Sequence, residues 1–142
     1  MKRSIIYLLF VLLLTSCGNN HSMTEKVINT YDNGQPAKVY QYDQNGQCVR
    51  EVDYYDSGAI WIEGPVKNDL RNGEWTSYFP DGKVQSTGVY KDGLRIGKAQ
   101  IFHENGRLWM DGYYKDDERC GEWVFYDEQG YEIERRDYGS CD

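Results

Sequence analysis

The side chains that could carry out chemistry are few in this chain, and most of them fall in turns. There are two histidines, His21 and His103. His103 lies in a turn whose equivalents earlier and later in the chain hold Phe79 and Asp127, so we expect a variable exposed turn residue rather than a catalytic base. Two histidines leave little room for a multi-histidine metal site or a proton relay.

Acidic side chains gather at Asp116, Asp117 and Glu118, where they could attract Ca²⁺. They lack the spaced oxygen ligands of a calcium loop, and their place in a charged loop accounts for them. Carboxylate pairs suited to glycoside hydrolysis arise by default in turns full of Asp and Glu. We therefore expect no catalytic residue, no metal and no cofactor, and an enzyme is the last of the function classes that we consider.

The first residues have the pattern of a targeting signal. Lys2 and Arg3 precede an apolar run from residue 5 to residue 14, which is too short to span a membrane as a helix. A basic start, a short apolar stretch and small residues before a cleavage point are typical of a secretory signal peptide, here residues 1–16.

The segment Leu14-Thr15-Ser16-Cys17 resembles the lipobox of bacterial lipoproteins, in which the cysteine carries acyl chains such as palmitate. This resemblance implies an envelope lipoprotein attached to the membrane through Cys17, with residues 17–26 as a flexible tether. Gly18 stands where inner-membrane lipoproteins commonly have Asp, which favours the outer membrane. The alternative is an ordinary signal peptide with an incidental cysteine.

Net charge and composition limit the classes of partner and of secondary structure that we expect. The net charge of −7 argues against nucleic acid and against an anionic lipid surface as electrostatic targets. Aromatic residues make up 15% of the chain and there are 15 glycines, a combination that favours strands and turns over helices.

The rest of the chain, residues 27–142, is predicted to be one repeat domain. Glycines recur at a constant interval of twenty-four positions, which we call the repeat length, in three series: Gly58, Gly82, Gly106 and Gly130; Gly64, Gly88 and Gly112; Gly73, Gly97 and Gly121. Earlier, Gly34 and Gly46 are half a repeat length apart. Counting both kinds of turn, the chain reverses about every twelve positions, which predicts about ten short strands.

Consecutive reversals in a meander fall on opposite edges of the sheet. The turns at residues 34, 58, 82, 106 and 130 therefore share one edge and are expected to be short. The charged loops Lys67–Gly73, Lys91–Gly97 and Lys115–Gly121, expected to be longer, share the other edge with the turn at residue 46. The result is an all-β, elongated antiparallel meander about 45–50 Å long, with no obvious second layer.

Residues 73–78 (Gly-Glu-Trp-Thr-Ser-Tyr) and 121–126 (Gly-Glu-Trp-Val-Phe-Tyr), each followed by a glycine-ended turn, resemble the bacterial variant of the MORN repeat. The middle copy, residues 97–102, keeps Gly97 and Phe102 but has Ala99 in place of tryptophan. The resemblance implies an elongated antiparallel sheet used mostly for protein–protein contact. Bacterial members are often described as YwqK-type antitoxins, which fits poorly with a lipoprotein leader, and the family offers no catalytic residues.

The four tryptophans form two series. Trp61 and Trp109 are two repeat lengths apart, as are Trp75 and Trp123, with Gln85 and Ala99 in the intervening copies. We expect mostly structural rungs, with the smaller residues making a dip in an aromatic surface. The candidate binding and framework aromatics are Trp61, Trp75, Tyr78, Trp109, Trp123 and Tyr126; of these we favour Trp75, Tyr78, Trp123 and Tyr126 for the sheet framework and its contact area.

With Cys17 lipidated, three cysteines remain. Cys120 and Cys141 fall at the same edge of the predicted sheet, and a disulfide between them would staple its open end. Cys48 lies about seven strands away and is expected to pack as a small apolar group.

Our leading hypothesis is a non-enzymatic, lipid-anchored envelope protein whose sheet binds another protein through rigid aromatic residues. A glycan-binding lipoprotein at the cell surface is the main alternative, because sugar rings stack on the same groups. An immunity or antitoxin-like factor would be a special case of protein binding. A homodimer would cover a bare apolar face.

Overall fold

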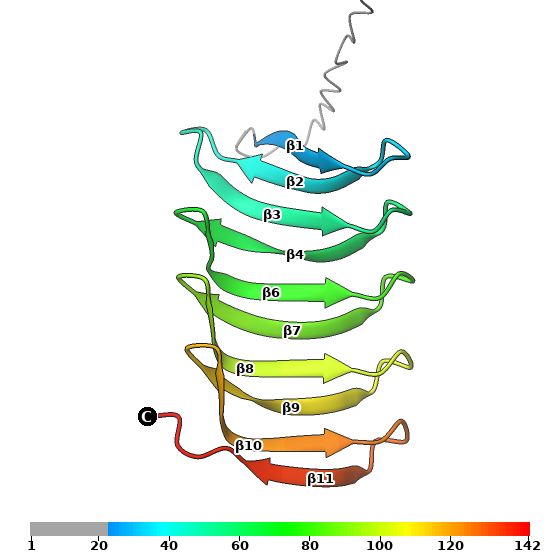
Figure 1. Ribbon diagram of the computed structural model, residues 1–142, viewed down its shortest axis with the longest axis vertical. Coiled ribbons are helices and arrows are strands. Elements are labelled where there is room, and N and C mark those ends of the chain that lie inside the picture. The colour runs from blue at the N-terminus through cyan, green and yellow to red at the C-terminus, as the bar shows by residue number, and fades with distance from the viewer. Residues whose placement is uncertain (1–22) are drawn as a thin grey trace, which may run out of the picture.

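Eleven β-strands stack along one axis in the computed structural model, which describes residues 23–142 (Figure 1). The strands are β1 (Thr24–Thr30), β2 (Pro36–Tyr42), β3 (Cys48–Tyr54), β4 (Ile60–Lys67), β5 (Leu70–Arg71), β6 (Gly73–Tyr78), β7 (Val84–Lys91), β8 (Leu94–Phe102), β9 (Leu108–Lys115), β10 (Glu118–Tyr126) and β11 (Glu132–Asp137). Ten of them follow chain order in a single antiparallel sheet, and the short β5 pairs with β4. The predicted all-β antiparallel meander is confirmed.

The sheet begins earlier than expected. β1 starts at Thr24, so residues 24–26 belong to the first strand rather than to a tether. The predicted signal peptide, Cys17 and the first part of the tether lie outside the described residues.

The two edges of the sheet are built by different turns. Figure 1 shows the reversals that end at Gly34, Gly58, Gly82, Gly106 and Gly130 on one edge and the charged segments on the other, as predicted. Their lengths are the reverse of the expectation. The glycine-ended reversals are loops such as residues 55–59, whereas only Asp92 and Gly93 separate β7 from β8.

The charged turns are tight because two successive residues adopt positive φ, which matches the twist of the flanking strands. Asp92 and Gly93 have φ of 50° and 88°, and Asp116 and Asp117 have 49° and 71°. The acidic cluster thus has a backbone role. Asp tolerates this left-handed conformation better than most residues do.

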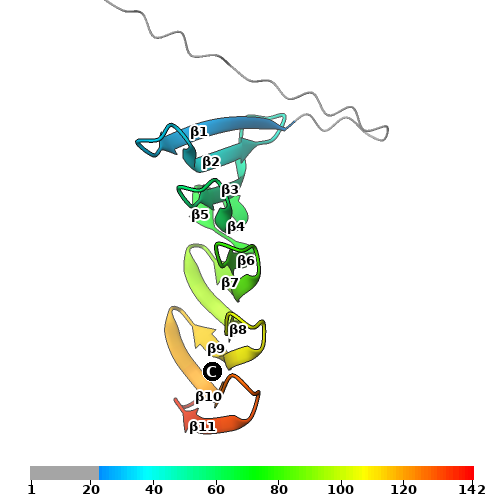
Figure 2. The same ribbon diagram turned by 90° about the vertical axis from the view of Figure 1, so that its right-hand side faces the viewer.

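The sheet is one layer thick, so its core must form within one face. Figure 2 shows curved strands following one another along the stack. Cross-strand register places Trp75, Gly88, Ala99 and Gly112 side by side on neighbouring strands, and we call the face that carries them the core face. Trp123 is fully buried there, with Ala99 and Met110, and Ile101, Tyr114 and Phe125 pack against them.

The N-terminal part of the core face buries charged groups at positions where later copies bury indoles. Glu51 lies one repeat length before Trp75 and is 8% exposed. Its Oε1 is 2.9 Å from Lys38 Nζ and 3.3 Å from Arg71 Nη2. Asp53, also buried, lies 3.3 Å from the same Lys38 ammonium. Paired charges thus take the place that indoles take later in the chain.

Candidate binding surface

Two of the four tryptophans are core residues. Trp75 is 2% exposed and Trp123 is 0% exposed. The packing role expected for them fits this placement, but the contact role does not, because a partner cannot reach a buried ring. The expectation that these two residues supply contact area is therefore corrected.

Each buried indole lies flat against a glycine on the preceding strand. A Cβ built on Gly64 would fall 2.4 Å from Trp75 Cδ2, and one on Gly112 would fall 2.2 Å from Trp123 Cδ2. The indole N–H of Trp75 donates to the Pro65 carbonyl at 3.0 Å, and that of Trp123 donates to the Tyr113 carbonyl at 3.1 Å. The two sites are equivalent copies, and we call each an indole slot.

An arginine and a tyrosine cover each filled slot. The guanidinium carbon of Arg71 lies 4.0 Å from the Trp75 ring centre, and that of Arg119 lies 4.4 Å from the Trp123 ring centre. Both distances suit a cation–π contact. Tyr90 meets Trp75 edge to face at 6.0 Å, and Tyr138 meets Trp123 in the same way at 6.3 Å.

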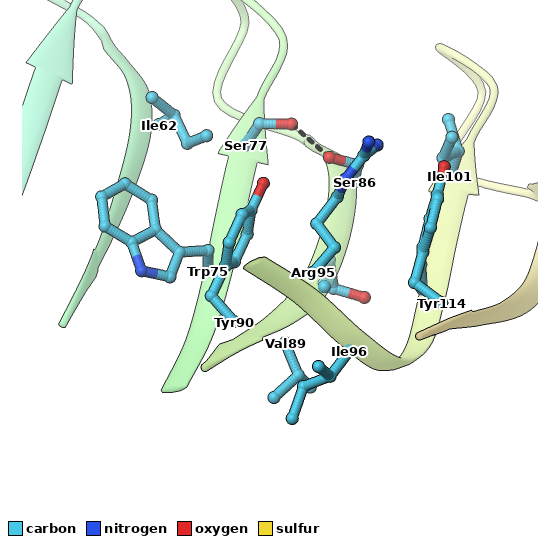
Figure 3. Close-up of a pocket in the computed structure, with 13 residues that line it drawn as sticks. Ile62, Trp75, Ser77, Ser86, Val89, Tyr90, Arg95, Ile96, Ile101 and Tyr114 are labelled. Atoms are coloured by element: carbon cyan, nitrogen blue, oxygen red, sulfur yellow. Dashed lines mark hydrogen bonds between the residues drawn. The ribbon is translucent and has the colours of Figure 1, made fainter. Parts of the chain in front are cut away.

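The middle slot contains no indole because Ala99 stands in the tryptophan position. A cavity of about 130 Å³ lies there, between the two filled slots (Figure 3). Its lining includes Gly88, Ala99, Trp75, Tyr90 and Tyr114. Sequence comparison of the copies anticipated a dip at Ala99, and the structure adds the glycine floor and the aromatic walls that shape it.

The other two tryptophans lie at the surface. Trp61 is 46% exposed and Trp109 is 42% exposed. They belong to the second strands of two equivalent hairpins, β4 and β9, four strands apart in the sheet, or about 19 Å. Tyr55 lies 6.3 Å from Trp61 and His103 lies 6.0 Å from Trp109, between ring centres. Trp61, Gln85 and Trp109, at successive repeat lengths, are called the tryptophan row below.

The candidate framework tyrosines are half-buried. Tyr78 donates its hydroxyl to Glu63 Oε1 at 2.9 Å, and burial together with this carboxylate raises the pKa of Tyr78. The carbonyl of Tyr78 accepts the hydroxyl of Tyr55 at 2.8 Å. His103 Nε2 lies 3.0 Å from the Tyr126 carbonyl, which can only accept, so the ring nitrogen donates. Both contacts tie a turn to the next hairpin, which gives His103 a structural role.

Cys120 and Cys141 form a disulfide, the pair suggested by the sequence, with their Cα atoms 5.1 Å apart. Cys120 is buried in β10, and Cys141 belongs to the segment after β11. Cys48 is a half-buried free thiol at the start of β3, and burial raises its pKa.

Neither metal ligands nor a membrane span emerge from the part of the chain that the structure describes. Within residues 23–142, no three side chains of His, Cys, Asp or Glu gather as a metal site would require. Over the same range, no helix is long and apolar enough to cross a membrane.

Comparison with known proteins identifies a repeat family for two segments of the chain. No curated protein is similar enough to the chain to count as a match. Residues 71–92 and 95–116 match the MORN repeat variant. These segments run from β5 to the turn after β9 and contain Trp75, the arginines over two slots and all the residues lining the middle slot except Ile62. The repeat suggested by the spacing of Gly, Trp and Tyr is thus confirmed for two copies, which match the MORN repeat variant.

Proposed function

We propose that this chain is a non-enzymatic binding module that recognises another protein through the tryptophan row. We further propose that it is a lipoprotein of a bacterial envelope, held at the outer membrane by acyl chains on Cys17. In this arrangement the sheet would present its outward aromatic residues to a partner in the same compartment.

The observation that carries the proposal is the exposure of Trp61 and Trp109, at 46% and 42%, on a scaffold whose other two tryptophans are buried. Packing of the framework does not require these rings to be covered. Large aromatic side chains held by a rigid sheet are the usual centres of binding energy at protein interfaces, because they bury area at little entropic cost. The match to the MORN repeat variant independently suggests a repeat-based binding module.

The proposal assigns no catalytic residue, and the roles of the polar groups support this. His103 uses one ring nitrogen to donate a hydrogen bond to the Tyr126 carbonyl. Asp117 accepts the Arg95 guanidinium N–H at 2.7 Å. A turnover activity lost on replacing one turn carboxylate would contradict the non-enzymatic assignment.

The test is crosslinking in the native envelope, followed by capture of the full-length protein and mass spectrometry. The bait variants are Trp61→Ala/Trp109→Ala and, as a matched control, Leu94→Ala, which removes a side chain of 43% exposure from the opposite edge. Circular dichroism establishes that each variant folds. We expect a partner that wild type and Leu94→Ala retain and the double tryptophan variant loses; equal capture by all three would overturn the proposal.

The membrane anchor has its own test. Replacing the proposed acylated residue, Cys17→Ser, should release the protein from the membrane fraction, and metabolic labelling with a fatty acid should disappear. A Cys48→Ser variant controls for loss of a thiol in general. If Cys17→Ser still sediments with membranes, the lipoprotein assignment is wrong.

A second candidate, glycan binding, rests on a hollow of about 770 Å³ beside Trp109. Its lining includes Gln85, His103, Glu104 and Asn105, polar side chains of the kind that bond sugar hydroxyls around a stacking ring. Intrinsic fluorescence titrated with envelope glycans would show a saturable change in wild type and none in Trp109→Ala. Absence of any change in wild type would exclude this candidate.

A further inference from the structure

The middle slot has the construction of an indole-binding site but supplies no indole of its own. In the filled slots, Trp75 follows Gly64 by eleven positions and Trp123 follows Gly112 by the same interval; Ala99 follows Gly88 likewise. Register places Ala99 between Gly88 and Gly112 on neighbouring strands. The glycine and the ring position thus recur at the same interval in all three copies, and the ring is missing from the middle one. There Gly88 pairs directly with Ala99, whereas the pairing is interrupted where an indole lies over Gly64 or Gly112.

The floor of the slot is open. A Cβ built on Gly88 would meet nothing within 4 Å, whereas the same atom on Gly64 or Gly112 would overlap an indole. The space above Gly88 is therefore free of side chains and backbone. The resulting cavity of about 130 Å³ is partly open to solvent, so a flat ring can lie on its floor without being fully enclosed.

The walls suit an aromatic guest. Trp75, Tyr90 and Tyr114 line the cavity with rings, as Figure 3 shows. The hydroxyls of Ser77 and Ser86, also in the lining, lie 2.6 Å apart and hydrogen-bond each other. An apolar ring entering the cavity would therefore leave this hydroxyl pair intact, and desolvation would cost little.

Two groups of the slot match those that hold Trp75 and Trp123. Val89 lies one repeat length after Pro65 and one before Tyr113, the residues whose carbonyls accept the indole N–H. Arg95 corresponds to Arg71 and Arg119 and lies 4.3 Å from the Tyr114 ring. In the filled slots the arginine lies 5.7 Å and 5.5 Å from the equivalent tyrosine, because it stacks on the indole instead.

We infer that the cavity over Gly88 and Ala99 is a binding site for an indole ring, supplied as a tryptophan side chain of a partner polypeptide. The guest ring would lie against Gly88, donate its N–H to the Val89 carbonyl and receive the Arg95 guanidinium on its outer face. The assignment to a polypeptide rests on the proposed protein-binding function. The ring selectivity of the site is testable without any partner.

The probe is N-acetyltryptophanamide, added to the purified full-length protein and followed by nuclear magnetic resonance at the Gly88 amide and the Ala99 methyl group. We expect saturable shifts at both. N-acetylphenylalaninamide, which has no N–H on its ring, should bind severalfold more weakly, and N-acetylalaninamide should not bind. Absence of saturable shifts with the tryptophan compound up to its solubility would overturn the inference.

Variants separate the slot from other aromatic surfaces. Gly88→Ala adds a methyl group where the guest ring must lie, into space that is open in the folded protein, so it should fold and bind about tenfold or more weakly. Ala99→Trp supplies the missing indole and should abolish binding. Ile133→Trp, which adds a tryptophan at an exposed position of β11 instead, should keep the affinity within about twofold.

Unchanged binding in both Gly88→Ala and Ala99→Trp would overturn the inference. The partner assignment can fail separately from the proposed function. Capture of a partner that depends on Trp61 and Trp109 but is unaffected by Gly88→Ala would remove the slot from that interface and leave the proposed function standing. Loss of capture in Gly88→Ala, with a folded protein, would support the slot as part of the interface.

Discussion

The ring of Trp123 lies so close to Gly112 that a single added carbon on the glycine would overlap it, 2.2 Å from Trp123 Cδ2. The glycine is required because it makes room for a ring on the adjacent strand. A single-layer sheet can bury an indole in this way without a second layer, because the backbone of one strand serves as the floor for a side chain of the next.

This relationship predicts opposite outcomes for the same substitution in different copies. Gly112→Ala should lower the free energy of unfolding by about 1–3 kcal/mol, because the indole must shift in a packed site. Gly88→Ala should be neutral or stabilise by up to about 1 kcal/mol, since the added methyl meets open space and stiffens the unfolded chain. Chemical denaturation of the two variants measures the contrast, and equal destabilisation would mean that the middle slot is closed in solution.

The two tryptophan series should separate in the same measurement. Trp123→Ala removes a fully buried ring and leaves the Tyr113 carbonyl without its indole donor, so we expect a loss of about 3–5 kcal/mol. Trp109→Ala removes a ring that is 42% exposed and should cost about 1 kcal/mol or less. A large loss in Trp109→Ala would show that the tryptophan row belongs to the framework and would weaken the proposed function.

Much of the fold follows from the sequence because the spacing of turn residues sets the strand order of a meander. The recurrence of Gly58, Gly82 and Gly106 predicts the loops of one edge, and the charged segments predict the other. The prediction of loop lengths is wrong. The charges of Asp116 and Asp117 suggest a long solvated loop, whereas their positive φ closes a tight turn that lets the flanking strands extend.

The division between buried and exposed tryptophans cannot be predicted from spacing, because both pairs are two repeat lengths apart. What distinguishes the buried pair is the residue on the neighbouring strand. Gly64 and Gly112 stand eleven positions before Trp75 and Trp123, and each glycine lies under the ring of its tryptophan. That interval is visible in the sequence, but only a known register gives it meaning. Spacing also does not predict the break at Asn72: Leu70 and Arg71 form the separate strand β5, whereas the equivalent Leu94 and Arg95 belong to the long strand β8.

Removing the disulfide should loosen the C-terminal end of the sheet before the rest. β11 is exposed along its whole length and, among the strands of residues 23–142, pairs only with β10. The Cys120–Cys141 bond closes a loop around it, and the backbone of Gly121 exchanges hydrogen bonds with Tyr138 and Gly139 nearby. Cys120→Ala/Cys141→Ser should lower the free energy of unfolding by about 3 kcal/mol. Amide hydrogen exchange should become faster in β11 and change less in β3.

Replacing both cysteines avoids a free Cys120 or Cys141 that could form disulfides between molecules, and Cys48→Ser serves as the control for losing a thiol outside the bond. If amide exchange in β3 and β11 rises equally in the double variant, the disulfide stabilises the sheet as a whole. The predicted local stapling of the last strand would then be wrong.

Folding shifts the pKa values of two aspartates, Asp53 and Asp117, in opposite directions. Burial raises the pKa of Asp53 despite the nearby Lys38 ammonium, whereas the hydrogen bond from Arg95 lowers the pKa of Asp117. The folded protein therefore binds the Asp53 proton more tightly than the unfolded chain does, and the Asp117 proton less tightly. On acidification from neutral pH, Asp53 should be protonated first, as carbon NMR of the two carboxyl groups would show.

The sign for stability follows from the same two shifts. The stabilisation from Asp117 is present above the ordinary aspartate pKa and disappears as the pH falls through its lowered value, so Asp117→Asn should destabilise at neutral pH and converge with wild type in acid. For Asp53 the ionised form is the penalised one, so wild type should gain stability relative to Asp53→Asn as the pH falls through the raised pKa. Parallel curves for wild type and Asp117→Asn would mean that the ion pair over the middle slot, between Arg95 and Asp117, does not form in solution.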